Sequence, residues 1–261
     1  MKERIITAIC LLAVVLPLIY LGGYWFIGLI LVAATIAVWE MMAMHDKLNT
    51  IPFWGKFITF AGTLLIIFDP RTCLTFSAFL MLFIFLLLIY FLRYKKGKED
   101  VGFRFCGFTL AYISFSFRAL LQIREHSLTL YVFLIAIVIL TDSMAYFAGR
   151  FFGRHKLAPK ISPKKTVEGA IGGWLAGASF AIAFGLINHL FTELWILVLL
   201  AISLPILSQI GDLAASALKR RYGIKDFGKM FPGHGGVMDR VDSQMLGGIL
   251  LYIILHFGGL R

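Results

Sequence analysis

The residues best suited to do chemistry lie near the carboxyl end of the chain, between Ser208 and Ser243. On a helix that continues from an apolar run, side chains at i, i+4, i+7 and i+8 share one face. A carboxylate, a hydroxyl and two cations occupy these positions: Asp212, Ser216, Lys219 and Arg220. Two more carboxylates, Asp239 and Asp242, are spaced i, i+3 just before the next apolar run. The pattern indicates a site for a metal ion and a phosphate.

The three carboxylates Asp212, Asp239 and Asp242 predict a site for one or two hard divalent ions such as Mg²⁺. Such ions take a few carboxylates and complete their shell with water and substrate phosphate. A second cation, monovalent or divalent, is left open. His234 is the only histidine of the segment and no cysteine lies nearby, so zinc is not favoured. Five intervening glycines let the loop fold tightly and bring backbone N–H groups near an anion: 223, 228, 233, 235 and 236.

A second basic segment, residues 155–169, strengthens the phosphate hypothesis. Ser162 followed by Pro163 predicts a helix N-cap and the first helical residue. Lys164, Lys165 and Thr166 would then lie at a helix N-terminus, where unpaired N–H groups and the helix dipole favour anions. The chain contains no GxxxxGK[ST] sequence and no nucleophile elbow, so neither a P-loop nor acyl hydrolysis is indicated.

Two further acids lie in or beside apolar runs, where a charge is costly. Asp142 follows the run 133–140. It pairs with Arg150 or Arg154 at a helix end, or it belongs to the site together with Tyr146; we favour the site. Glu40 lies at the end of an early apolar run, and the sequence leaves structure and function equally open for it.

The elements that position these residues must be membrane helices. The 261 residues are 60% hydrophobic and 15% charged, with a mean hydropathy of +0.87, whereas globular chains are about 45–50% apolar and about 25% charged. A membrane helix needs about 20 apolar residues. The sequence predicts an all-α, polytopic membrane protein with about nine spans: 5–21, 24–44, 54–69, 73–92, 103–122, 128–148, 168–190, 194–215 and 243–258.

The distribution of charge predicts the orientation of these spans. With nine spans, the N-terminus lies on the same face of the membrane as every second connection, namely those after spans 2, 4, 6 and 8. Of the 25 Lys and Arg residues, 21 fall on this face. By the positive-inside rule that face is cytoplasmic, with the N-terminus inside and the C-terminus outside. We expect a multi-pass protein of the inner (plasma) membrane. Residues 1–122 would form the first five spans, and residues 123–261 a catalytic region open to the cytoplasm.

The motifs of the second half resemble a known family. The run Ser216-x-Leu-Lys-Arg-x4-Lys225-Asp226-x-Gly228-x2-Phe231-Pro232-x-His234-Gly235-Gly236-Val237-x-Asp239-Arg240-Val241-Asp242 is similar to the signature of the CDP-diacylglycerol synthases, or phosphatidate cytidylyltransferases. Upstream, Asp142-x3-Tyr146-x2-Gly149-Arg150 and Ser162-Pro-Lys-Lys-Thr-x-Glu168-Gly169 also resemble that family. The first five spans match it only in being apolar.

The resemblance implies the reaction of CTP with phosphatidate to give CDP-diacylglycerol and pyrophosphate, with Mg²⁺. It implies that Asp212 and Asp239 are the principal metal ligands, with Asp242 and Asp142 as nearby carboxylates. The CTP phosphates would be held by Lys219, Arg220, Lys225 and Arg240. Asp226 and His234 would position the loop, and His234 is alternatively a proton donor.

The other candidate residues are assigned to substrate binding. Ser162, Lys164, Lys165 and Thr166 would receive either the triphosphate or the lipid phosphate, and the sequence does not decide between them. The remaining substrate-binding candidates are Tyr146, Glu168, Ser216, Gly235 and Gly236.

The expected partners are CTP, phosphatidate and membrane lipid, with no nucleic acid; a homodimer is left open. A CTP-dependent lipid-alcohol kinase is the alternative enzyme, and it differs in releasing CDP instead of pyrophosphate. A transporter fits less well, because transporters often place polar residues at broken midplane helices, whereas here they gather at one predicted face.

Overall fold

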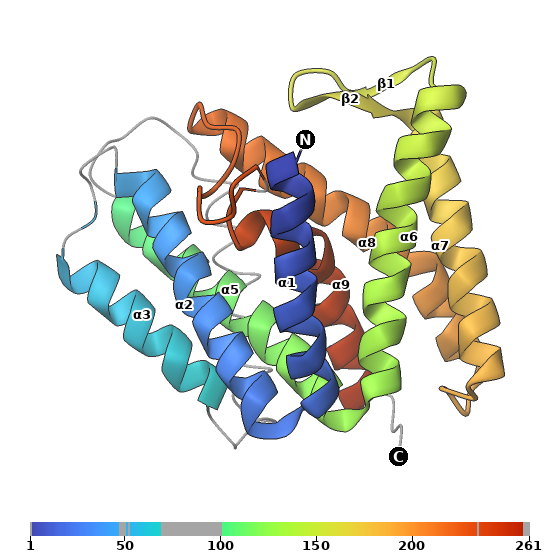
Figure 1. Ribbon diagram of the computed structural model, residues 1–261, viewed down its shortest axis with the longest axis horizontal. Helices are drawn as coiled ribbons and strands as arrows, with labels where there is room; N and C mark the ends of the chain where they lie inside the picture. Colours follow the sequence, from blue (N-terminus) through green and yellow to red (C-terminus); the bar gives the residue numbers. More distant parts are fainter. Residues whose placement is uncertain (1, 47–50, 52, 69–100, 234, 258–261) are drawn as a thin grey trace. The chain divides into compact units, whose positions relative to one another are not determined.

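The computed structural model describes residues 2–46, 51, 53–68, 101–233 and 235–257 (Figure 1). Within these ranges the chain is helical apart from short connections and one small hairpin. The helices are α1 (Lys2–Leu21), α2 (Gly23–Asp46), α3 (Phe53–Phe68), α5 (Val101–His126), α6 (Leu128–Phe151), α7 (Val167–Ile187), α8 (Leu194–Arg221) and α9 (Met238–Phe257). The strands of the hairpin are β1 (Lys156–Ala158) and β2 (Ser162–Thr166).

Every predicted span within the described ranges coincides with a helix, and the prediction of a helical membrane protein is confirmed. Among the described residues, five helices are long and apolar enough to cross a membrane, namely α2, α5, α6, α7 and α8, and two shorter apolar helices cover Ile6–Leu21 and Phe53–Phe68. The predicted span 73–92 lies outside the described residues. The largest shifts are at α8, which ends at 221 instead of 215, and at α9, which begins at 238 instead of 243.

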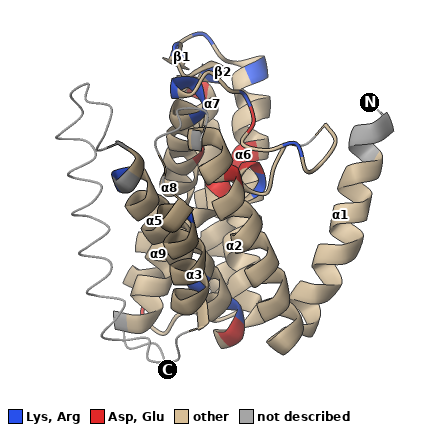
Figure 2. Cartoon of the chain, turned by 90° about the vertical axis from the view of Figure 1, so that its left-hand side faces the viewer, with Lys and Arg blue, Asp and Glu red and all other residues tan. Residues whose placement is uncertain are grey.

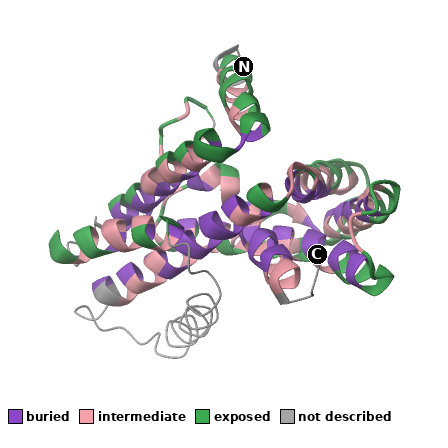
Figure 3. Cartoon of the chain, turned by 90° about the horizontal axis from the view of Figure 1, so that it is seen from below, coloured by how far each residue is buried: buried purple, intermediate pink, exposed green. Residues whose placement is uncertain are grey.

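The chain forms two compact units. The first contains residues 1–118 and 227–238, and the second contains residues 119–226 and 239–261. In the first unit α2 packs against α1 and α3; in the second α6, α7 and α8 pack against one another. Buried residues line the sides of helices that face their neighbours, and exposed residues lie on the outer sides (Figure 3). The functional division at residue 122 stays a prediction.

Helix α7 shows how the sequence sorts a buried face from an outer one. Gly169, Gly173 and Gly177 are buried along one stripe. A Cβ atom added to Gly173 would lie 2.5 Å from the carbonyl oxygen of Thr141 on α6, so only glycine allows this approach. The outer side exposes the apolar residues Ile171, Leu175, Ile182 and Leu186. This division suits a helix packed against protein on one side and lipid on the other.

The predicted start of α7 at Ser162 and Pro163 is wrong. Residues Ser162–Thr166 form β2, which pairs antiparallel with β1, and α7 begins at Val167. Thr166 is the N-cap, because its Oγ1 accepts a hydrogen bond from the Gly169 N–H at 3.1 Å. Pro163 is tolerated because a short two-stranded ribbon leaves many N–H groups outside the ladder. Lys164 and Lys165 are therefore strand residues and do not form a helix N-terminus.

Candidate active site

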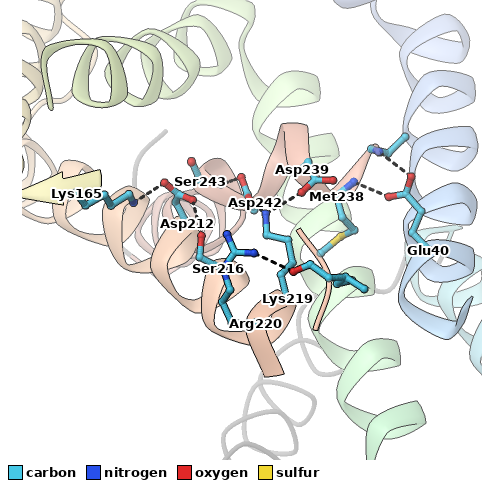
Figure 4. A network of polar contacts seen from close by, with 12 residues as sticks. Glu40, Lys165, Asp212, Ser216, Lys219, Arg220, Met238, Asp239, Asp242 and Ser243 are labelled. Carbon is cyan, nitrogen blue, oxygen red and sulfur yellow. Dashed lines mark hydrogen bonds and ion pairs between the residues drawn. The ribbon is translucent and has the colours of Figure 1, made fainter. Parts of the chain in front are cut away.

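A cluster of acids and lysines lies in the second unit (Figure 4). We call it the acid–lysine cluster. It is made of side chains from α6, β2, α8 and α9: Asp142, Lys165, Asp212, Lys219, Asp239 and Asp242. Charged residues of this unit also gather at the end of α6 and α7 that carries the hairpin (Figure 2). All six members come from the segments that the sequence singled out.

Lys219 joins the two acids of α9. Its Nζ lies 2.7 Å from Asp239 Oδ1 and 3.7 Å from Asp242 Oδ2. The three side chains are only 10%, 4% and 9% exposed. Burying any one of these charges alone would cost several kcal/mol, so the ion pairs are a condition for burying them all.

Lys165 neutralises the third acid from a different element. Its Nζ lies 2.5 Å from Asp212 Oδ2, and both side chains are partly buried. The Ser216 hydroxyl donates to Asp212 Oδ1 at 3.4 Å, which confirms that Asp212 and Ser216 share one face of α8. The hairpin thus delivers a cation to a carboxylate of α8. From the sequence, Lys165 is predicted only to bind a phosphate, and this contact with Asp212 is not.

A close approach of α8 to α9 at Gly211 brings Asp212 and Asp242 together. A Cβ atom at Gly211 would lie 2.7 Å from the Asp242 carbonyl oxygen. The Ser243 N–H donates to Asp242 Oδ1 at 2.9 Å. Asp242 is buried, and its carboxylate interacts with the charges of Asp212 and Lys219. An added positive charge would favour the ionised carboxylate.

Asp142 is joined to the same cluster. It interacts with Asp212 and Lys165, and it hydrogen bonds to the Ser243 side chain, a residue that the sequence analysis missed. Arg150, the alternative partner, donates instead to the Tyr146 hydroxyl at 3.2 Å on an exposed surface. The contacts of Asp142 with the cluster therefore favour the site over an ion pair at the helix end.

The donor chemistry of the cluster fits a hard cation. Four carboxylates carry −4 when ionised and two lysines carry +2, which leaves −2. Within the described ranges no three His, Cys, Asp or Glu side chains are gathered as a ready ligand set. Mg²⁺ needs only one or two carboxylates, because water and substrate phosphate complete its shell.

Other candidate residues have different surroundings. Arg220 donates to the carbonyl oxygens of Ile161 at 3.3 Å and Ile224 at 3.0 Å, so it fastens the end of α8 to the hairpin. Glu168 accepts hydrogen bonds from the backbone N–H groups of Arg154 and His155. Ser162 is partly buried in β2, and four charged candidates are exposed: Lys164, Lys225, Asp226 and Arg240. The hydrogen bonds of Arg220 and Glu168 described above are thus made with groups outside the acid–lysine cluster. His234 lies outside the described residues.

The glycine-rich loop, residues 227–238, belongs to the first unit together with Glu40. Glu40 is buried; its Oε1 accepts from the Val237 N–H at 3.0 Å and its Oε2 from the Met238 N–H at 2.9 Å. Gly233 and Gly235 have φ angles of 75° and 81°, which other residues rarely adopt. Two N–H groups of this loop thus bind a carboxylate of the protein itself, and the predicted approach of the loop to a phosphate stays a prediction.

Comparison with known proteins agrees with the geometry and the motifs. The profile of the Cytidylyltransferase family matches residues 2–258. A phosphatidate cytidylyltransferase of Staphylococcus epidermidis is 35% identical over 98% of this chain and 99% of its own length. Those of Staphylococcus haemolyticus and Brucella abortus are 36% and 38% identical, over 98% and 97% of this chain and 99% and 92% of their own lengths. The chain belongs to the cytidylyltransferase family.

Proposed function

We propose that the protein is a phosphatidate cytidylyltransferase, which makes CDP-diacylglycerol and pyrophosphate from CTP and phosphatidate, and that the acid–lysine cluster is its active centre. The activity rests on family membership and on relatives with this name that match over nearly their whole length. The observation that carries the site is the gathering of four acids and two lysines, with Lys219, Asp239 and Asp242 buried, where the family motifs meet in a helical membrane protein.

The chemistry asks for little proton transfer. A phosphomonoester has a second pKa of about 6, so the phosphate of phosphatidate is largely a dianion at neutral pH. One of its oxygens attacks the α-phosphorus of CTP and forms the new P–O bond. The bond from the α-phosphorus to the bridging oxygen breaks, and pyrophosphate leaves with the electron pair. Catalysis then depends on positioning and on neutralising charge, which acids, lysines and a cation supply.

Asp212, Asp239 and Asp242 are proposed as the ligands of one or two Mg²⁺ ions. When bound, the ion supplies positive charge to the triphosphate and the leaving pyrophosphate. Lys219 keeps the two acids of α9 together, and Lys165 lies beside Asp212. The exposed cations are proposed to receive the CTP phosphates or the lipid phosphate from the surface: Lys164, Arg220, Lys225 and Arg240.

The proposal includes the membrane topology. Nine spans, with the N-terminus in the cytoplasm and the C-terminus outside, would place the active centre on the cytoplasmic face of the plasma membrane. The one-sided distribution of Lys and Arg supports this orientation. The homodimer that the sequence leaves open is tested by light scattering of the purified protein in detergent.

The decisive assay uses purified protein in detergent with labelled CTP, phosphatidate and Mg²⁺. We expect label in CDP-diacylglycerol and release of pyrophosphate, both abolished by a chelator; release of CDP would indicate the lipid kinase instead. Asp212→Asn should lower turnover by roughly a hundredfold or more, because one electrostatic contact at a reacting phosphate is worth that much. Glu193→Gln, an exposed acid at the start of α8, is the matched control. Wild-type turnover in Asp212→Asn would overturn the assignment of the cluster.

A further inference from the structure

Glu40 is a buried carboxylate in a helix long and apolar enough to cross a membrane. A charge in that position is costly, so it needs compensating contacts. The N–H groups of Val237 and Met238, one on each carboxylate oxygen, provide them (Figure 4). Met238 opens the 20-residue helix α9, where unpaired N–H groups and the helix dipole stabilise a negative charge.

The glycine-rich loop is shaped around this carboxylate from both of its ends. Gly228, near the start of the loop, and Gly236, near its end, both face Glu40. A Cβ atom at either position would overlap the Glu40 carboxyl group. Neither glycine has a left-handed backbone, so their small size is needed for the approach of Glu40 and not for a turn.

We propose that Glu40 is a positioning residue of the active centre. It fixes the position of the loop and of the first turn of α9. Because Asp239 is bonded directly to Met238, the backbone position of Asp239 is fixed as well. Asp242 follows one turn later on the same helix. Glu40 is assigned no contact with the substrate, because it is buried and each of its oxygens binds a backbone N–H group of the loop or of α9. The inference rests on the proposed function, since it gives Asp239 and Asp242 their role.

Glu40→Gln tests the role with little change in shape. The amide nitrogen cannot accept the N–H that a carboxylate oxygen accepts, so the start of α9 loses one of its two contacts. We expect kcat to fall by roughly ten- to a hundredfold, since small misplacements of catalytic groups have effects of that size. KM for CTP and phosphatidate should change by less than about threefold, while the Mg²⁺ concentration for half-maximal activity should rise.

A second pair of variants tests the contact itself. Gly236→Ala should inactivate the enzyme, because its methyl group overlaps the Glu40 carboxylate. In a Glu40→Ala background the space is open, so adding Gly236→Ala should cost little further activity. Gly28→Ala is the matched control on the same helix α2, because a Cβ atom there has no neighbour within 4 Å. If the effects of Glu40→Ala and Gly236→Ala multiply independently, the proposal fails.

The remaining outcomes separate this proposal from its alternatives. Melting temperature and size-exclusion profile in detergent identify a folded protein. If folded Glu40→Gln turns over like the wild type with an unchanged Mg²⁺ requirement, Glu40 is a structural anchor only and the proposal is overturned. If Glu40→Gln does not fold, Gly228→Ala gives the same readout with the carboxylate still present. An inactive wild-type protein would contradict the proposed function instead, so the two failures are distinguishable.

Discussion

Lys219 and Lys165 show how burial determines how much an ion pair contributes to stability. Each pairs with an acid of the same cluster, but the Lys219 side chain is 10% exposed and that of Lys165 is 29% exposed. Water screens the Lys165 pair, whereas Lys219 sits between two acids that are almost completely enclosed. The two lysines should therefore differ in what their removal costs, although both belong to the proposed site.

We expect Lys219→Met to lower the free energy of unfolding by about 3 kcal/mol or more, because it leaves Asp239 and Asp242 buried without a cation. Lys165→Met should cost less than about 1 kcal/mol, as is usual for a partly exposed pair. Thermal unfolding in detergent compares the variants. Lys219→Met combined with Asp242→Asn should recover part of the loss. Equal losses for the two lysines would contradict this account of the cluster.

Residue types and local spacing were enough to find most of the cluster. The i, i+4 contact of Asp212 with Ser216 and the grouping of Asp239 with Asp242 follow from short separations along a helix. The contact between Lys165 and Asp212 does not, because it joins a strand to a distant helix. Glu40 was left undecided for the same reason: its partners lie 197 and 198 residues away. Contacts of this kind depend on how helices pack, which periodicity does not show.

At the scale of elements, apolar length predicted the helices, and a side-chain cap marks the start of α6 and of α7. In the sequence, Ser162 followed by Pro163 predicts the N-cap and first helical residue of α7, with Thr166 within the helix N-terminus. The pairing of β1 with β2 holds Ser162 in a strand, so Thr166 becomes the N-cap and α7 begins at Val167. Strand pairing in the hairpin thus outweighs the tendency of Ser162 and Pro163 to start a helix.

The choice of cap is open to a direct test. Thr166→Ala should lower the free energy of unfolding by about 1 kcal/mol, because the Gly169 N–H loses its acceptor. Ser162→Ala, which removes the same hydroxyl from the strand, should change it by less than about 0.5 kcal/mol. Thermal unfolding in detergent measures both, and Thr166→Ser should behave like the wild type. A larger loss for Ser162→Ala would restore the earlier start of α7.

At the scale of the whole molecule, composition and charge together place a site for two anions at the membrane surface. An apolar content of 60% keeps the chain in the bilayer, where phosphatidate resides, while a net charge of +11 is concentrated in the connections that carry the site motifs. A lipid phosphate and a nucleoside triphosphate are both anions, and they meet only at the membrane surface. Cationic connections next to buried acids suit a site that binds both anions at the membrane surface.

The sidedness of the reaction tests this arrangement. CTP and pyrophosphate are too highly charged to cross a bilayer, so an active centre on the cytoplasmic face should be reached only from that side. Sealed inside-out vesicles given external CTP should make CDP-diacylglycerol at the rate of detergent-permeabilised vesicles. Sealed right-side-out vesicles should stay inactive until they are permeabilised. The activity of a cytoplasmic marker enzyme measures the seal in each preparation. Full activity of sealed right-side-out vesicles would place the active centre on the outer face, and the positive-inside orientation of the nine predicted spans would be wrong.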